Sequence, residues 1–379
     1  MVNSKRIMLT GNSEMVIFKF RLELIERLLQ EGYEVYTAFP KTAFGDGETV
    51  SRQYACHYIE LDISSHGTNP FSDFRLLQQY KKVLQEVKPG TLLTFTIKPN
   101  IYGAIAAASC NVPCIINITG LGTAVEQPGI LQIITTTLYR MATKKVQRVF
   151  FQNTENKQFF ANRNIADGKR GLLPGSGVNL ERFKVLEYPH KDTIEFLFMA
   201  RILKEKGIDQ YLDAAKVIRC KYPNTVFHVL GVCDDNDYAA KLKQMEDAGF
   251  IKYHGQQKDV LPFQKISSCT IHPTYYPEGM SNVLLESAAC GRPIIATDRS
   301  GCREIIDDGV NGYICKQQDS TDLIEQIEKF LALTWEQRRD MGLAGRAKVE
   351  REFDRQIVVN AYLKEIENSV NLIGYIENE

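Results

Sequence analysis

The chain has 379 residues, of which 44% are hydrophobic and 24% charged. This length predicts two domains, since one domain takes about 100–200 residues, and the composition excludes a disordered or collagen-like chain. The nine cysteines form no CxxC pair, which favours reduced thiols over disulfides or a metal site. We therefore expect a cytoplasmic location.

The net charge is zero, but it is unevenly distributed along the chain. Residues 1–175 carry 20 basic against 14 acidic residues (+6), which leaves 26 against 32 (−6) for the remainder. A basic half suits anionic lipid headgroups or a phosphorylated acceptor, although ordinary solvated surfaces also carry uneven charge. No apolar stretch approaches the roughly 18 residues of a spanning helix, and the first residues lack a signal-peptide pattern. The sequence predicts neither export nor membrane integration.

Short apolar runs alternate with helix-period segments along the whole chain. In the first half, strands are expected at residues 7–10, 33–36, 56–59, 92–95, 114–117 and 149–151, and helices at about 15–30, 73–88, 99–109 and 130–145. After residues 174–177 the pattern restarts, with strands expected at 194–200, 226–230, 251–254, 270–272, 293–297 and 312–315. Such alternation indicates βαβ units and parallel sheets.

These patterns predict an α/β protein with two doubly wound, Rossmann-like domains that face each other across a cleft. We expect an N-terminal domain over residues 1–180 and a C-terminal domain over 181–354. Residues 355–379 are expected to form a helix that packs back on the first domain. Ligands of doubly wound sheets bind at the carboxyl ends of the strands, so the cleft is the expected site.

Residues 273–288 carry the densest set of candidate site residues. A helix should begin at about Ser281, because Ser281 and Asn282 are favourable N-cap residues. Its first N–H groups and its dipole would form an anion site suited to a diphosphate. Glu278 lies in the preceding loop and Glu286 one to two turns into the helix, a spacing suited to binding hydroxyl groups. By spacing alone, an ordinary capped helix with a solvated glutamate explains the segment equally well.

A second cluster follows the strand expected at 194–200. Arg201 ends this strand, and Lys206 lies at the start of the next helix. Two cations there suit a diphosphate leaving group, which arginine binds in bidentate fashion and lysine as a point charge. Surface arginines and Lys–Gly pairs before helices are common, so this cluster gains weight only in combination with the first.

Together the two clusters resemble the retaining glycosyltransferases of the GT-B architecture that carry two glutamates eight residues apart (group 1, or family 4). The resemblance covers essentially the whole chain and is closest to bacterial enzymes that extend polyprenyl-diphosphate-linked glycans. It rests on residues 174–178, Arg201 with Lys206, Glu278 with Glu286, and residues 291–297. It implies a cytoplasmic enzyme, peripheral to the inner face of the cytoplasmic membrane, that acts in capsule, O-antigen or glycoprotein-glycan assembly.

The resemblance also implies roles for individual residues. Arg201 and Lys206 would hold the donor diphosphate, Glu278 hydroxyls of the transferred sugar, and Glu286 the donor ribose. The remaining donor-binding residues would be Gly11, Gly255 near the base, and Gly279, Met280, Ser281, Asn282, Val283 and Leu284. The departing diphosphate would take the acceptor proton in a front-face displacement, with UDP as the first and GDP as the second candidate nucleotide.

The first domain should supply the acceptor side. Gly11 follows the first strand but is not part of a dinucleotide fingerprint, because G-x-G-x-x-G would need glycines at positions 13 and 16. Lys98 follows the fourth strand, and Thr119 and Gly120 follow the fifth, with Glu126 close behind. Each also suits a tight turn or helix start. Many family members have a histidine after the fifth strand; this chain does not, which leaves Thr119 or Lys98 as substitutes.

No metal site is expected, because the acidic run Asp234-Asp235-Asn236 reads as a loop and helix start. The partners expected are a nucleotide-sugar donor, a lipid-linked or free glycan acceptor and a membrane surface, with no nucleic acid. Residues 129–145 are apolar with a cationic end, as in interfacial helices, although a helix that covers a sheet needs the same stripe. A nucleotide-sugar epimerase and an inactive nucleotide-sugar-binding regulator are the alternative functions.

Overall fold

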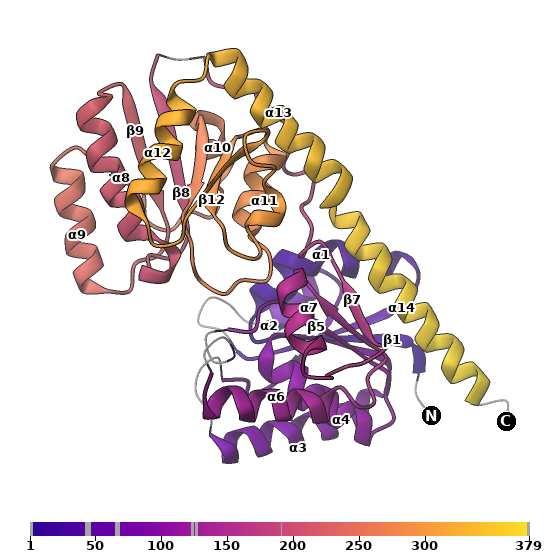
Figure 1. Ribbon diagram of the computed structural model, residues 1–379. Coiled ribbons are helices and arrows are strands. Elements are labelled where there is room, and N and C mark those ends of the chain that lie inside the picture. Colours follow the sequence, from indigo (N-terminus) through magenta and orange to yellow (C-terminus); the bar gives the residue numbers. More distant parts are fainter. Residues whose placement is uncertain are drawn as a thin grey trace. The chain divides into compact units, whose positions relative to one another are not determined.

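The computed structural model describes residues 3–41, 47–64, 69–122, 125, 128–190 and 192–376. The chain forms two compact units (Figure 1). The first unit contains residues 1–176 and 356–379, and the second contains residues 177–355. The chain therefore passes from one unit to the other twice, near residues 176 and 355.

A parallel seven-stranded sheet forms the centre of the first unit, with the order β3-β2-β1-β4-β5-β6-β7. Its strands are β1 (Asn3–Thr10), β2 (Glu34–Phe39), β3 (His57–Glu60), β4 (Pro89–Phe95), β5 (Cys114–Ile118), β6 (Arg148–Phe151) and β7 (Arg170–Leu172). All six strands expected in this half are present. The edge strand β7 was not expected, because its three residues include no apolar run.

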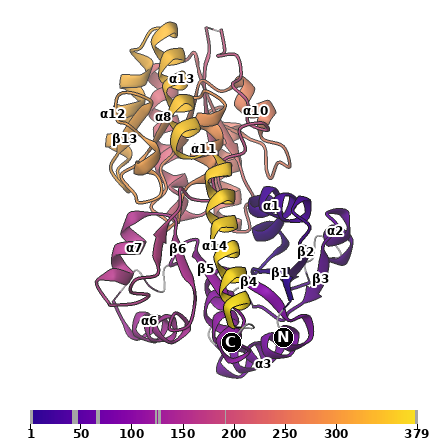
Figure 2. The same ribbon diagram turned by 90° about the vertical axis from the view of Figure 1, so that its right-hand side faces the viewer.

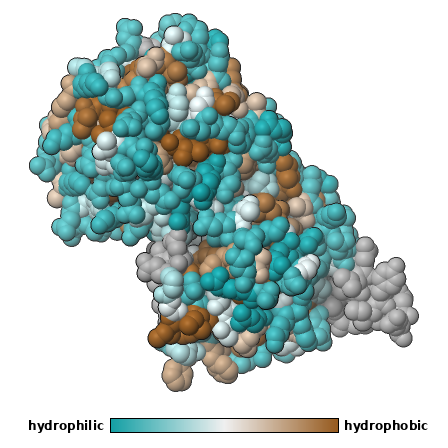
Figure 3. Space-filling view, in the orientation of Figure 1, coloured by the Kyte–Doolittle hydropathy of each residue, from teal (hydrophilic) through white to brown (hydrophobic). Residues whose placement is uncertain are grey.

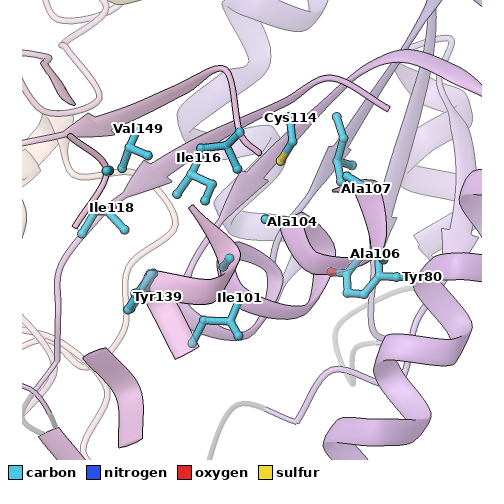
Figure 4. Packing of buried hydrophobic residues seen from close by; sticks show 14 of the residues in the cluster. Tyr80, Ile101, Ala104, Ala106, Ala107, Cys114, Ile116, Ile118, Tyr139 and Val149 are labelled. Carbon is cyan, nitrogen blue, oxygen red and sulfur yellow. The ribbon is translucent and has the colours of Figure 1, made fainter. Parts of the chain in front are cut away.

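Helices cover both faces of this sheet. They are α1 (Glu14–Gln30), α2 (Gly47–Gln53), α3 (Pro70–Val87), the π-helical turn η1 (Pro99–Gly103), α4 (Ala104–Ser109), α6 (Ile130–Ala142), α7 (Thr154–Ala161) and α14 (Arg355–Ile376). Residues of α3, α4 and α6 bury one face, and residues of α1 and α14 bury the other. Figure 4 shows the first of these cores, in which Tyr80 and Tyr139 flank Ile101 and Ala104 beneath the sheet.

Helix α3 begins three residues earlier than the expected position 73. Asn69 is its N-cap, and the Asn69 side chain accepts a hydrogen bond from the Phe71 N–H at 3.0 Å. Pro70 occupies the first helical position, where its missing N–H costs nothing. The Asn-Pro pair was therefore the start signal for this helix.

The last helix, α14, packs on the sheet of the first unit (Figure 2). Tyr362 is fully buried, with its ring 5.4 Å from that of Phe150, and Asn117 donates a hydrogen bond to its hydroxyl. Arg148 forms a 2.8 Å ion pair with Glu365. The prediction that the C-terminal helix returns to the N-terminal domain is confirmed.

The second unit is built around a parallel six-stranded sheet with the order β10-β9-β8-β11-β12-β13. Its strands are β8 (Ile194–Met199), β9 (Thr225–Leu230), β10 (Lys252–Tyr253), β11 (Cys269–His272), β12 (Ile294–Thr297) and β13 (Gly312–Cys315). Its helices are η2 (Lys204–Lys206), α8 (Ile208–Lys221), α9 (Asn236–Asp247), α10 (Leu261–Ile266), α11 (Asn282–Ala289), η3 (Arg303–Ile305), α12 (Ser320–Leu331) and α13 (Trp335–Glu352). Two doubly wound α/β domains were predicted, and this prediction is confirmed.

Candidate active site

Both sheets reverse their winding direction at one place. In the second unit the reversal lies between β8 and β11, which are neighbours although β9 and β10 separate them in the chain. Connections leave such a point toward opposite faces and open a crevice at the carboxyl ends of the two strands. Arg201 follows β8, and the loop with Glu278 follows β11. The two predicted clusters therefore belong to one crevice.

Close backbone packing brings the loops after β8 and β11 together. Gly207 ends η2 with φ +77°, and a Cβ at this position would lie 2.1 Å from the Pro273 carbonyl oxygen. The N–H of Tyr275 donates to the Glu205 carbonyl at 2.9 Å, and the Thr274 hydroxyl donates to the same oxygen at 3.2 Å. Only glycine fits at position 207. The close contact between the two loops places Lys206 beside Glu278.

Lys206 and Glu278 form an ion pair. Their side chains are only 12% and 15% exposed, and the Lys206 ammonium also lies 4.6 Å from the centre of the Tyr276 ring. The His272 Nε2 atom lies 3.8 Å from the Glu278 carboxylate. Burial alone would raise the pKa of Glu278, but the charge of Lys206, with a contribution from His272, lowers this pKa to about 2. Glu278 is therefore held as a carboxylate that can accept hydroxyl hydrogen bonds.

This lowered pKa predicts an acid-dependent stability. A carboxyl group whose pKa falls on folding stabilises the protein above its unfolded pKa near 4.5, and this contribution disappears as the pH falls toward 2. This contribution to the free energy of unfolding is on the order of 2–3 kcal/mol. We expect thermal unfolding of the wild type to lose more stability between pH 5 and pH 3 than that of Glu278→Gln. Equal slopes of melting temperature against pH for the wild type and Glu278→Gln would contradict the lowered pKa of Glu278.

The start of α11 presents an open anion site next to this pair. The N–H of Ser281 donates to the Gly301 carbonyl at 2.8 Å, and the first backbone bond inside the helix joins Leu285 to Ser281. The N–H groups of residues 282–284 consequently have no partner within the helix. Ser281 is the N-cap, as predicted, but its side chain makes no capping bond, and its buried Oγ has no hydrogen-bond partner among the described residues.

The other residues assigned to donor binding differ in what they can offer to a ligand. Met280 and Leu284 are 6% and 0% exposed and belong to an apolar core, so only their backbones can contact a ligand. The Gly279 carbonyl lies against Gly301, where a Cβ would approach it to 2.8 Å. Glu286 is 9% exposed on the second turn of α11, which keeps its carboxylate close to the helix start.

Arg201 and Gly255 follow β8 and β10, which lie on either side of β9 in the sheet. The Arg201 side chain is exposed and forms no ion pair with the described residues, which leaves it available to a ligand. Gly255, with φ +64°, follows β10, and its carbonyl accepts a 2.9 Å hydrogen bond from the N–H of Gly231. Gly231 in turn lies directly against the Ala200 carbonyl. The ends of β8, β9 and β10 are thereby linked.

Two candidates of the first unit, Gly11 and Lys98, lie at its own reversal point, between β1 and β4. A Cβ on Gly11 would lie 2.8 Å from the Val16 side chain, so packing of α1 by itself favours glycine there. Lys98 is 16% exposed and forms a 2.9 Å ion pair with Asp73 of α3. Thr119 and Gly120 follow β5 and are half-buried. Glu126 lies outside the described residues.

Sequence reasoning missed two neighbours of the site and one partner of Lys98. His272 ends β11, and Tyr276 lies in the loop that follows. Both residues lie shortly before Glu278 in the sequence, at the end of a strand. This position was the signal from which they could have been predicted. Asp73 gave no comparable signal, because its contact with Lys98 depends on the packing of α3.

Some classes of site are absent from the part of the chain that the structure describes. No group of three or more histidine, cysteine or acidic side chains is placed to hold a metal ion. All nine cysteines are unpaired. Among the described residues, none of the helices has both the length and the apolarity needed to span a bilayer.

Two parallel sheets of this kind, each wound about one reversal point, have the GT-B architecture. Residues 6–153 match the family "Glycosyl transferase 4-like", and residues 181–348 match "Glycosyl transferases group 1". The chain is therefore a glycosyltransferase, with a group 1 domain in its second half and a 4-like domain in its first.

Two curated relatives act on lipid-linked substrates, according to their names. The chain is 25% identical over 368 residues to the N,N'-diacetylbacillosaminyl-diphospho-undecaprenol alpha-1,3-N-acetylgalactosaminyltransferase of Campylobacter jejuni, and this match covers 92% of the chain and 94% of that protein. It is 23% identical to the Escherichia coli UDP-Gal:alpha-D-GlcNAc-diphosphoundecaprenol alpha-1,3-galactosyltransferase, over 67% of the chain and 70% of that protein.

Solved structures agree with the fold. A glycosyltransferase from Rickettsia africae superimposes with a TM-score of 0.79 and 16% identity, over 96% of this chain and 98% of its own. Anabaena Alr3699/HepE in complex with UDP gives a TM-score of 0.77 and 16% identity, over 96% and 99% of the two chains. These likenesses establish the architecture of the chain.

Proposed function

We propose that the protein transfers a hexose or N-acetylhexosamine from a UDP-linked donor to a polyprenyl-diphosphate-linked glycan, with retention of anomeric configuration. The observation that carries this proposal is the buried Lys206–Glu278 pair beside the open N-terminus of α11. The names of the relatives from C. jejuni and E. coli support the lipid-linked acceptor, and the second supports a UDP donor. The process served would be the assembly of a surface polysaccharide or a glycoprotein glycan.

In the proposed reaction, Lys206, Arg201 and the N–H groups of residues 282–284 bind the donor diphosphate. The bond between the anomeric carbon and the diphosphate oxygen breaks, and the acceptor hydroxyl oxygen bonds to that carbon from the same face. Its proton passes to the departing diphosphate, which leaves as UDP. Preorganised cations stabilise the charge that develops on the leaving group, and the binding geometry holds the reactants together.

The remaining residues position the donor and the acceptor. Glu278 would accept hydrogen bonds from hydroxyls of the transferred sugar, and Glu286 from the ribose hydroxyls. The first unit would bind the acceptor at the carboxyl ends of β4 and β5, where Lys98, Thr119 and Gly120 lie. Because Lys98 is paired with Asp73, it would serve there as part of a dipolar pair and not as a free cation.

A ligand panel followed by a transfer assay tests this function. Addition of a nucleotide sugar at 100 times its dissociation constant stabilises the protein by about 2.7 kcal/mol, which a thermal-shift measurement detects. We expect UDP-sugars to shift the melting temperature more than GDP- or ADP-sugars. The shifting donor should then yield free UDP only when a lipid-linked glycan is added. A changed sugar without any acceptor would identify an epimerase, and donor binding without turnover would identify a regulator.

Metal removal gives a second prediction. Lys206, Arg201 and the start of α11 would supply positive charge to the proposed diphosphate, so no divalent ion would be needed to neutralise it. We expect transfer activity to survive treatment with EDTA and dialysis. A loss of activity that Mn²⁺ or Mg²⁺ restores would refute metal independence without affecting the assignment of the glutamates.

We further propose that the first unit docks on the membrane that carries the acceptor, through helix α6 and the start of α3. Ile130, Ile133 and Ile134 of α6 are 78%, 64% and 48% exposed, and Phe71 and Phe74 of α3 are 88% and 63% exposed. Figure 3 shows the apolar patch over the beginning of α6. The inner face of α6 uses other residues (Thr135, Thr136, Tyr139 and Ala142), so covering the sheet does not explain the isoleucines.

The position and charge of this patch fit an anionic membrane. Helices that follow parallel strands begin at the carboxyl ends of those strands, so the patch lies at the edge proposed to bind the acceptor. Arg140, Lys144 and Lys145 are exposed at and beyond the other end of α6. Apolar insertion combined with basic residues is the pattern of interfacial helices.

Liposome flotation tests the docking surface. We expect the protein to float with anionic vesicles at low salt and less with neutral vesicles or at high salt, because attraction contributes about 1 kcal/mol per basic residue near the surface. The triple variant Ile130→Ser/Ile133→Ser/Ile134→Ser should lose flotation. The matched control is Val217→Ser/Val310→Ser, which alters exposed apolar residues of the second unit and should float normally. Equal flotation of both variants would exclude α6.

A further inference from the structure

Three polar side chains form a hydrogen-bonded chain across one face of the second sheet. The Glu195 carboxylate lies 2.9 Å from Nε2 of His228, and Nδ1 of His228 lies 2.9 Å from Nε2 of His254. Glu195 is on β8, His228 is on β9, and His254 follows β10. His228 is 3% exposed, and its ring stacks on that of His254 with 5.2 Å between centroids. None of these residues belongs to the site described above.

The carboxylate sets the direction of the first hydrogen bond: it only accepts, so His228 carries a proton on Nε2 and donates it to Glu195. When each ring carries a single proton, Nδ1 of His228 accepts and Nε2 of His254 donates. The Nδ1 of His254 is left as an acceptor. This nitrogen makes no hydrogen bond with the described residues. It is also not one of the buried side-chain atoms that lack a partner, so it is accessible.

Burial favours the neutral form of His254 and holds the pKa of this ring below its usual value. The neutral ring keeps its acceptor nitrogen available at physiological pH. The chain therefore ends in a hydrogen-bond acceptor of defined polarity.

This acceptor lies at the edge of the crevice that holds Arg201 and the α11 N-terminus. His254 directly precedes Gly255, which is hydrogen-bonded to Gly231 beside the Ala200 carbonyl. The His254 ring also packs on Phe263, 4.8 Å between centroids, and Phe263 shares an apolar cluster with Val283 of the first turn of α11. Two strand spacings, roughly 10 Å, separate the ends of β8 and β10. A nucleoside bound through its diphosphate at Arg201 spans a comparable distance.

We propose that the Glu195–His228–His254 chain reads the nucleobase of the donor, with Nδ1 of His254 accepting a hydrogen bond from a ring N–H. His254 is the contact residue, and His228 and Glu195 are positioning residues that fix its tautomer. The inference rests on the proposed use of a nucleotide donor and adds a base preference to it. Uracil and guanine present a ring N–H, whereas adenine and cytosine do not. A polar group left without its partner in such a site discriminates strongly between ligands.

The test compares UDP with UDP methylated at N3 of uracil, each titrated against the full-length protein by calorimetry. We expect the wild type to bind UDP at least tenfold more tightly. Glu195→Gln should reduce this preference about three- to tenfold, because an amide both donates and accepts and no longer fixes the tautomer. His254→Leu should remove the hydrogen-bond part of the preference while diphosphate binding remains. Glu325→Gln is the control, because Glu325 is exposed on α12 and takes no part in the Glu195–His228–His254 chain.

Imidazole nitrogen NMR supplies a readout that a purely structural role would not change. His254 should be protonated on Nε2 in the wild type and should populate both tautomers in Glu195→Gln. If the wild type binds UDP, but Glu195→Gln and His254→Leu keep the full preference, the base-reading inference is wrong and the proposed function stands. If the wild type binds no nucleotide sugar and no UDP, the proposed function is wrong and the inference falls with it.

Discussion

Replacement of Lys206 by alanine is expected to lower the turnover number about a hundred- to a thousandfold. The ammonium group is nine-tenths buried, fixed by Glu278 and Tyr276, and adjacent to the open N–H groups of α11. Its position is set before any ligand binds, so its full effect is available as charge develops on the leaving diphosphate. Removal of one preorganised group of this kind typically costs about a hundred- to a thousandfold in rate.

Steady-state kinetics at saturating donor measure this effect. Lys204→Ala is the matched control, because Lys204 belongs to the same 3-10 helix but is exposed. We expect the control to retain the wild-type rate and Arg201→Ala to resemble Lys206→Ala. Lys206→Ala should also melt at a lower temperature, because it leaves Glu278 buried without its partner, so the rates are compared well below that temperature. Near-normal turnover of Lys206→Ala would remove this residue from the proposed mechanism.

Replacement of Glu286 by alanine is expected to reduce kcat/KM for the donor about a hundredfold. Hydrogen bonds between charged and neutral groups contribute roughly 1.5–3 kcal/mol, which corresponds to about a tenfold to a hundred-and-fiftyfold change. The fold should survive, because alanine is the most favourable residue for a helix and Glu286 is on the second turn of α11. Glu286→Gln should lose less, since an amide oxygen still accepts hydrogen bonds.

The kinetic comparison should use the 2′-deoxy donor as well. The wild type should prefer the ribose donor, and Glu286→Ala should treat the two donors nearly alike. Glu325→Gln, an exposed glutamate of α12, is the control and should behave as the wild type. An unchanged ribose preference in Glu286→Ala would assign the hydroxyl contact to another group.

The sequence was most informative where local chemistry determines the structure. The strand and helix pattern predicted both sheets, and the Pro–Gly loop followed by Ser281 predicted the start of α11. The location of Arg201, Lys206 and the β11 loop at one edge of the sheet also followed, because parallel strands carry their functional loops at one edge. Each of these predictions depends on a few neighbouring residues.

Contacts between distant segments were not predictable in the same way. The Lys98–Asp73 pair requires the packing of α3, and Tyr362, in the core beneath α1 and α14, comes from the end of the chain. The outward direction of Ile130 and Ile133 could not be read from their spacing, because an apolar stripe fits either side of α6. The Glu195–His228–His254 chain depends on three strands being adjacent in the order β8, β9 and β10. Such adjacency is a property of the completed sheet.

The return of α14 to the first unit has a consequence for synthesis of the protein on the ribosome. The second unit is continuous in sequence, so it can fold as soon as residue 355 has emerged. The first unit lacks Val358, Val359, Tyr362, Leu363 and Ile366 of its core until the end of the chain is made. At about 5–20 residues per second, the intervening 200 or so residues take roughly 10–40 s. During that interval one apolar face of the first sheet is covered only by α1, and chaperones that bind nascent chains would recognise the first-made half longer than the second.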